Sequence, residues 1–179
     1  MPDIFATNDG RAIHFSTSGW VDVRRSGTAN TATITNQEVS SIEVAHVTAG
    51  RGEQWSISRL FLTFDTTSIS VSPVSAKLNI RGLTNSDLDV IVLKSDELTT
   101  WSTSGFNEIV LNADALSDIV SLDTFKVCVI DYDYDYLDIE LGNGNTLRNG
   151  SYFSSKGGTA FDPYLSYVAV TDNATFFGA

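Results

Sequence analysis

The chain has 179 residues, of which 42% are hydrophobic and 18% charged, with a formal net charge of −11 and one cysteine. The length suits a single domain with a substantial core, and one cysteine excludes an internal disulfide. Residues 1–84 carry seven acidic and seven basic side chains, whereas residues 85–179 carry fifteen acidic and four basic ones. This acidity argues against a partner that is nucleic acid or an anionic membrane surface.

The N-terminal residues 1–11 lack the basic start and the apolar block of a signal peptide. No run approaches the ~20 apolar residues that a membrane-spanning helix needs. We therefore expect a protein that is made in the cytoplasm and is not exported by the general secretory route.

Residues 2–10 are polar and end in a turn motif, after which alternation predicts a strand over residues 11–16. Trp20, Val21 and Val23 predict the start of another strand. Further strands are predicted over residues 40–47, 87–93, 106–111, 125–130, 147–155 and 163–170. The small, polar residues 26–35 predict a loop or a weak edge strand.

The centre of the prediction is the stretch from Ser58 to Ile80, which holds two alternating apolar runs. Residues Leu60 to Phe64 place three apolar side chains on one face, and Val74 to Ile80 place four on one face. We expect these two strands to lie side by side in a two-layer framework, joined by the polar connection 65–72.

Only residues 113–120 have apolar side chains at helical spacing, so they predict one short helix. Nine or ten short strands without an internal repeat predict an all-β fold. The expected architecture is a single jelly-roll β-sandwich of two antiparallel sheets, with at most that one helix. It would occupy residues 1–170, with residues 171–179 as a C-terminal extension.

The stretch from Asp131 to Glu140 alternates acidic residues with tyrosines. If the strand over 125–130 continued, Asp131, Asp133 and Asp135 would enter the core, and each unpaired buried carboxylate would cost several kcal/mol. We therefore expect the strand to end, bulge or twist near Asp131.

Three explanations for this stretch remain open. It could be a solvated edge whose charges prevent pairing with other sheets. It could be a calcium site in which Asp131, Asp133 and Asp135 supply oxygen ligands. It could also be a surface for a protein partner or a sugar. The aromatic residues considered for an interface or a glycan site are Trp101, Tyr132, Tyr134, Tyr136, Phe176 and Phe177, and the tryptophans Trp20 and Trp55 are further candidate anchors.

Motifs for common catalytic chemistry are absent from the sequence: there is no GxSxG, no HExxH, no P-loop and no paired CxxC. His14 is expected to face outward, and His46 is expected to be a core or rim residue. We therefore predict a protein that is not an enzyme and has no cofactor, with calcium as the one ion considered.

Three patches of the sequence resemble a known family. The run RLFLTFDTTSI over residues 59–69, followed by VSAKL over residues 74–78, is similar to the core of the disaggregatase-related repeat domain. The closing segment FSSKGGTAFDPYLSYV, residues 153–168, resembles the end of that domain, and Asn8-Asp9-Gly10 resembles the opening of its phage-borne versions. The closing segment carries Lys156 where the family would have an acidic residue.

The resemblance implies a jelly-roll sandwich of the kind found in phage virion proteins and in surface carbohydrate-binding modules. Arg59, at the head of the first patch, is expected to pair with a carboxylate such as Asp65 or Asp162, or with the carbonyl oxygens at the end of a strand. The function expected is that of a bacteriophage structural protein, a capsid decoration, cement or tail-fibre-associated subunit located in the virion. Its partners would be other virion proteins and further copies of itself, for example in a trimer. The alternative is a carbohydrate-binding module or adhesin for a surface polysaccharide, with calcium as a stabilising ion.

Overall fold

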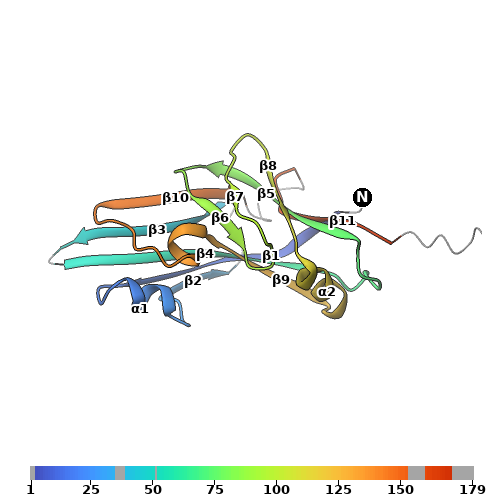
Figure 1. Ribbon diagram of the computed structural model, residues 1–179, viewed down its shortest axis with the longest axis horizontal. Coiled ribbons are helices and arrows are strands. Elements are labelled where there is room, and N and C mark those ends of the chain that lie inside the picture. Colours follow the sequence, from blue (N-terminus) through green and yellow to red (C-terminus); the bar gives the residue numbers. More distant parts are fainter. Residues whose placement is uncertain (1–2, 35–38, 51, 153–159, 171–179) are drawn as a thin grey trace, which may run out of the picture.

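The computed structural model describes residues 3–34, 39–50, 52–152 and 160–170 (Figure 1). The strands are β1 (Asp3–Ser16), β2 (Thr31–Ile34), β3 (Val39–Ala49), β4 (Gly52–Asp65), β5 (Ser75–Thr84), β6 (Asp89–Val92), β7 (Thr99–Thr100), β8 (Phe106–Val110), β9 (Thr124–Asp131), β10 (Asn145–Tyr152) and β11 (Tyr164–Val168). The helices are α1 (Trp20–Arg25), α2 (Ala113–Ser121) and a π-helical turn, η1 (Tyr132–Tyr136).

The strands form one continuous antiparallel sheet that folds over on itself. Its order is β2-β1-β11-β5-β10-β3-β4-β9-β6-β7, β8 pairs with β5, and an additional pairing joins β1 to β4. Six strands thereby close a ring: β1, β11, β5, β10, β3 and β4. The all-β, sandwich-like architecture predicted from the sequence is confirmed. Its two layers belong to one hydrogen-bonded sheet, and the jelly-roll winding within this class stays a prediction.

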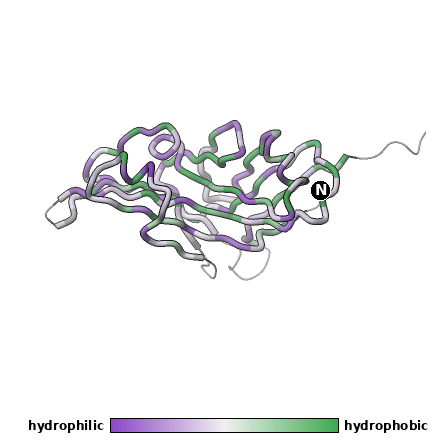
Figure 2. The backbone as a smooth tube through the Cα atoms, turned by 90° about the horizontal axis from the view of Figure 1, so that it is seen from below, coloured by the Kyte–Doolittle hydropathy of each residue, from purple (hydrophilic) through white to green (hydrophobic). Residues whose placement is uncertain are grey.

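Strand β4 lies at the centre of the sheet because it pairs with three strands. β1 runs along one edge, while the other edge is shared between β3 in its first half and β9 in its second half. The second half turns Leu60, Leu62 and Phe64 into the main core, where each is at most 1% exposed. Figure 2 shows how apolar and polar positions alternate along the strands around this core.

The two central runs are both strands, as predicted, but they are not neighbours. β4 pairs with β1, β3 and β9, whereas β5 pairs with β8, β10 and β11. Both send their apolar side chains into the same main core. The alternation identified the buried faces correctly except at Val74, which precedes β5 and is 66% exposed. It carried no information about which strands exchange hydrogen bonds.

Strand β5 changes partner at a glycine. Its residues 75–79 pair with β11, and Gly82 pairs with Ser151 of β10. A Cβ added at Gly82 would lie 2.0 Å from the carbonyl oxygen of Ser102, so this close approach of two backbones requires a glycine.

The N-terminal segment differs from the expectation of a polar lead-in over residues 2–10. β1 starts at Asp3, pairs first with β11 and then with β4, and its register shifts between Ala6 and Asn8. This irregularity interrupts the two-residue alternation of side chains along the strand. The sequence pattern therefore did not predict the first part of β1.

The run beginning at Trp20 is also not a strand. α1 begins after Gly19, which has φ 131°, and it buries Trp20 and Val23 on one side. These residues are three positions apart, which fits a helical turn as well as a short strand. The fold therefore has α1 and the turn η1 in addition to the single short helix predicted.

The helix predicted over residues 113–120 is confirmed as α2. Its N-terminus is capped by Asn112, whose side-chain oxygen accepts a hydrogen bond from the Ala115 amide at 3.1 Å. In Figure 1, α2 lies toward the end of the molecule where β11 is found, and α1 lies toward the opposite end. Among the residues described, no helix is long and apolar enough to cross a membrane.

A second, smaller core lies under α1. It consists of Trp20, Val23, Val44, Trp55, Ile57 and Leu141, with Tyr134 and Leu147 packed against it. This core joins α1, β3, β4 and the segment after β9, and it supports the surface described next.

Candidate functional site

The acidic tyrosine segment begins where β9 stops. Asp131 is the last residue of β9 and is 1% exposed. Its Oδ1 accepts hydrogen bonds from the amides of Tyr134, at 2.5 Å, and Asp135, at 3.3 Å, so its carboxylate caps the π-helical turn η1. The prediction that the strand ends, bulges or twists near Asp131 is confirmed.

Asp131 is an unusual carboxylate because only one of its oxygens is hydrogen bonded. Among the residues described, no donor reaches the buried Oδ2. Burial raises the pKa of Asp131 to about 6 against the lowering effect of the two amides. The carboxyl is therefore charged at neutral pH and protonated under mildly acidic conditions.

Asp135 is buried by a different arrangement. Its two oxygens accept hydrogen bonds from Nε and Nη2 of Arg59 on β4, at 2.7 and 2.8 Å. This is a bidentate ion pair in which the carboxylate side chain is 3% exposed. Arg59 does pair with a carboxylate, but the partner is neither Asp65 nor Asp162 as expected. The turn η1 brings Asp135 back over β4, and nothing in the local spacing indicates this.

A second arginine links the segment to α1. Nε of Arg24 donates to the carbonyl oxygen of Asp135 at 2.9 Å and lies 3.2 Å from Oδ1 of Asp138. The same carboxylate oxygen accepts the indole N–H of Trp20 at 3.2 Å. Arg59 in turn donates to the carbonyl oxygen of Arg24 at 2.9 Å. The two arginines therefore fasten α1, β4 and η1 together.

The far end of the segment is fixed by a tryptophan and a histidine. The indole N–H of Trp55 donates to Oε1 of Glu140 at 2.8 Å. His46 stacks on Trp55 with 4.4 Å between ring centroids, and its Nδ1 lies 2.7 Å from the carbonyl oxygen of Leu141. His46 is thus buried, as predicted, and it also holds the loop at Leu141.

Between these two anchors the segment exposes aromatic and apolar side chains. Tyr136, Leu137 and Ile139 are 47%, 46% and 49% exposed. Tyr132 stacks on Tyr136 with centroids 5.6 Å apart and planes at 19°. We call these four residues, Tyr132, Tyr136, Leu137 and Ile139, the tyrosine surface. Its backbone is held on both sides while its side chains stay open to a partner.

The calcium site considered at Asp131, Asp133 and Asp135 receives no support from this geometry. Asp131 caps η1, and Asp135 is bound by Arg59. In the described ranges, no group of three or more His, Cys, Asp or Glu side chains could hold a metal ion.

Only some of the aromatic residues considered for an interface or a glycan site lie on the surface. Trp101, one of these residues, is 2% exposed in the main core and donates its indole N–H to the carbonyl oxygen of Gly150 at 3.1 Å, so it does not lie on the surface. Tyr134 packs against the smaller core. Phe176 and Phe177 lie outside the described residues. Trp20 and Trp55, considered as anchors, are both buried core residues.

His14 and Cys128 are two further side chains that could take part in chemistry, and neither is an exposed nucleophile. His14, expected to face outward, is half-buried and lines a cavity of about 110 Å³ together with Arg59 and Val23. Burial raises the pKa of the Cys128 thiol to about 12, so the reactive thiolate is disfavoured.

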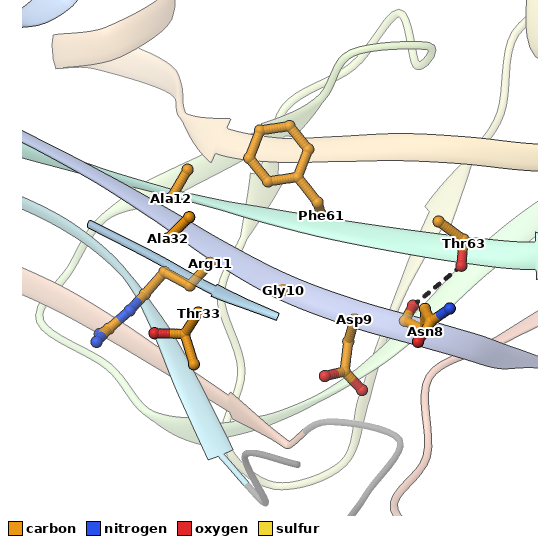
Figure 3. A pocket seen from close by; sticks show the side chains of 9 residues that line it. All are labelled: Asn8, Asp9, Gly10, Arg11, Ala12, Ala32, Thr33, Phe61 and Thr63. Atoms are coloured by element: carbon orange, nitrogen blue, oxygen red, sulfur yellow. Dashed lines mark hydrogen bonds between the residues drawn. The ribbon is translucent and has the colours of Figure 1, made fainter. Parts of the chain in front are cut away.

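Two open cavities were not foreseen from the sequence. One, of about 290 Å³, lies over β1, β2 and β4 and is lined by Phe61, Ala12 and Ala32 (Figure 3). The other, of about 250 Å³, is lined by polar residues that include Arg11, Ser40 and Ser41, and by the apolar Leu83. Neither leaves a motif in the sequence, because each is formed by strands that are distant along the chain.

No family model matches the chain, and no curated protein matches it significantly. The resemblance to the disaggregatase-related repeat domain therefore stays a prediction.

Proposed function

We propose that this chain is a bacteriophage structural protein that acts through protein–protein contacts in the virion, as a capsid decoration, cement or tail-fibre-associated subunit. The observation that carries the proposal is the tyrosine surface. Exposed aromatic and apolar side chains on a fixed backbone are the usual anchors of protein interfaces. The sequence patches that resemble a family with phage-borne members support the same conclusion.

Binding at the tyrosine surface should cost little conformational entropy, because the backbone of the segment is already fixed. Arg59 and Arg24 fix the segment at one end, and Trp55 fixes it at the other. A partner would therefore not have to order the backbone of the segment when it binds. We expect the partner to be another virion protein or a second copy of this chain, and a trimer is one such assembly.

A particle-binding experiment tests the proposal. Purified particles of the phage that encodes the chain should contain it as a stoichiometric component. Particles assembled without it should bind the added wild-type protein, while L137D and I139D should bind at least about tenfold more weakly, because each places a charge in a desolvated interface. V71D is the matched control, since Val71 is also exposed, at 61%, but lies elsewhere. Absence of the protein from purified particles would refute the virion role.

The alternative, a carbohydrate-binding module or adhesin, is favoured by one specific observation. The stacked rings of Tyr132 and Tyr136 present an aromatic face next to exposed side chains. In this case the isolated protein should bind glycans on an array, and Tyr136→Ala should abolish the binding. Arrays read with and without calcium also test the ion considered from the sequence. Silence under both conditions would count against this alternative.

A further inference from the structure

An apolar cavity of about 290 Å³ lies on the outer face of the sheet, over β1, β2 and β4 (Figure 3). Ala12 pairs with Ala32 and Gly10 pairs with Phe61, so the side chains at these positions share one face. The two neighbours of Phe61 along β4 enter the main core, and Phe61 therefore points outward and is 42% exposed. We call these four residues, Gly10, Ala12, Ala32 and Phe61, the hollow. Its open space lies beside the Phe61 ring because the other three residues are small.

The hollow suits an uncharged aromatic or apolar group. Asp9 and Arg11 also line the cavity, but in Figure 3 their side chains lie on the other side of β1 from the Phe61 ring. A charged ligand would therefore lose hydration in the hollow without gaining a counter-charge. Among the described strands, β2 pairs only with β1, so the hollow lies next to an edge of the sheet.

The chain itself carries a segment that fits this surface. Residues 171–179, which we call the tail, follow the last residue that the structure describes. Their sequence, TDNATFFGA, has one charged side chain and two adjacent phenylalanines, Phe176 and Phe177. A phenylalanine gains free energy when its ring is removed from water, and the hollow offers an apolar surface large enough for one ring.

The direction of β11 favours the tail of a second copy over the tail of the same copy. β11 runs antiparallel to β1, and Val168 near its end is held by a hydrogen bond from the Val74 amide at 2.8 Å. The chain thus leads away from Gly10, which at about 3.3 Å per residue lies roughly 30 Å back along β1 from the level of Val168. The chain from Val168 to Phe176 spans at most roughly 28 Å when fully extended, which leaves no length for a reversal of direction.

We propose that the tail of a second copy docks in the hollow, with a phenylalanine ring against Phe61 and the small residues beside it. If each copy gives its tail to the other, two identical contacts related by a twofold axis close a dimer. This contact does not require a virion, so the inference goes beyond the proposed function and does not rest on it.

Sedimentation equilibrium of the full chain over a range of concentrations tests the inference. We expect the wild type to dimerise and Phe176→Ser/Phe177→Ser to dimerise at least about tenfold more weakly, because the aromatic anchors are lost. Ala32→Lys should show a similar loss, since it places a charged side chain in the hollow. Val170→Ser and Val110→Lys are the matched controls. These valines are 51% and 54% exposed and lie outside the tail and the hollow, so both variants should dimerise as the wild type does.

Mixing the two defective variants separates exchange between copies from docking within one copy. Ala32→Lys keeps its tail and Phe176→Ser/Phe177→Ser keeps its hollow, so an equal mixture should form a heterodimer more tightly than either variant forms a dimer alone. Absence of this heterodimer at concentrations up to about 1 mM would overturn the proposal. A wild type that stays monomeric over the same range, or a dimer that both variants leave unchanged, would overturn it as well.

A synthetic peptide of residues 170–179 keeps the result interpretable if Ala32→Lys does not fold. In excess, the peptide should dissociate the wild-type dimer, while the same peptide with serine at both phenylalanine positions should not. A dimer that persists in excess peptide would contradict the proposal. None of these measurements involves Leu137 or Ile139, so their failure leaves the particle-binding test unaffected.

Discussion

At the scale of single residues, Asp131 decides where the long apolar face of β9 ends. Phe125, Val127 and Val129 face the main core, and Asp131 follows them on the same face. Its carboxylate is buried at a cost, and the hydrogen bonds by which Oδ1 caps the turn that reverses the chain offset part of that cost. The sequence predicted this break because burial of a carboxylate is costly in any fold.

The raised pKa of Asp131 predicts an unusual pH dependence. The folded protein binds this proton up to about pH 6, whereas an unfolded aspartate, with a pKa of 3.8, has already lost it. The folded state thus holds more protons between these values, and the free energy of unfolding should fall as pH rises through this window. The contribution amounts to about 3 kcal/mol for a shift of this size. Urea unfolding at a series of pH values from about 4 to 7 measures it.

Asp131→Asn should remove this slope, because asparagine caps the turn without a charge at any of these pH values. At neutral pH the variant should be at least as stable as the wild type. Asp133→Asn is the control. Asp133 makes no such cap and contributes less than burial does to the raised pKa of Asp131, so this variant should keep most of the wild-type slope. An identical slope in Asp131→Asn and the wild type would show that other groups carry the pH dependence.

At the scale of elements, the ion pair of Arg59 and Asp135 holds η1 against β4. Arg59→Met should lower the free energy of unfolding by about 2–4 kcal/mol at neutral pH, because Asp135 would stay buried without its partner. The partial exposure of Arg59, 29%, keeps the expected loss below that for a fully buried pair. Urea unfolding measures the change, and limited proteolysis should show faster cleavage within residues 132–140.

Lys77 and Glu108 offer a matched control for this prediction. Their side chains are 44% and 59% exposed and lie 2.7 Å apart. Lys77→Met should therefore change the free energy of unfolding by less than about 1 kcal/mol. Equal effects of the two substitutions would mean that the Arg59 pair contributes no more than a surface pair.

The segments at Trp20 and Trp101 were predicted wrongly from the sequence, and both errors have the same physical cause. The run at Trp20 became a helix because Trp20 and Val23 are buried together in the smaller core. Trp101 lies in a polar stretch that looks like an exposed loop, yet it is buried, and its indole donates to Gly150, 49 positions away. Both outcomes depend on contacts between distant segments, whereas alternation reports only on the local face of a strand.

At the scale of the whole molecule, the closure of the sheet also lies beyond local patterns. β1 pairs with β11 near its start and with β4 along most of its length, so the N-terminal strand joins segments from both ends of the chain. The predicted apolar faces of β4, β5 and β9 all contribute to the main core. Local alternation thus indicated most of the buried side chains of these strands, with Val74 as an exposed exception. Strand order follows from long-range pairing, which leaves no periodic pattern in the sequence.

The net charge predicts how salt affects the stability of the complete fold. At about pH 7 the net charge is −11, so the excess acidic side chains should repel one another in the folded chain. Dissolved ions screen such repulsion between exposed groups. Raising NaCl from roughly 20 to 200 mM should therefore increase the melting temperature, by about 2–4 °C for each 1 kcal/mol gained. Near the sequence pI of about 4.3 the same salt step should have little effect, because the net charge is then small. Calorimetry at both pH values measures the difference. A melting temperature that falls with salt at neutral pH would show that screened ion pairs, such as that of Lys94 with Asp118, outweigh the repulsion.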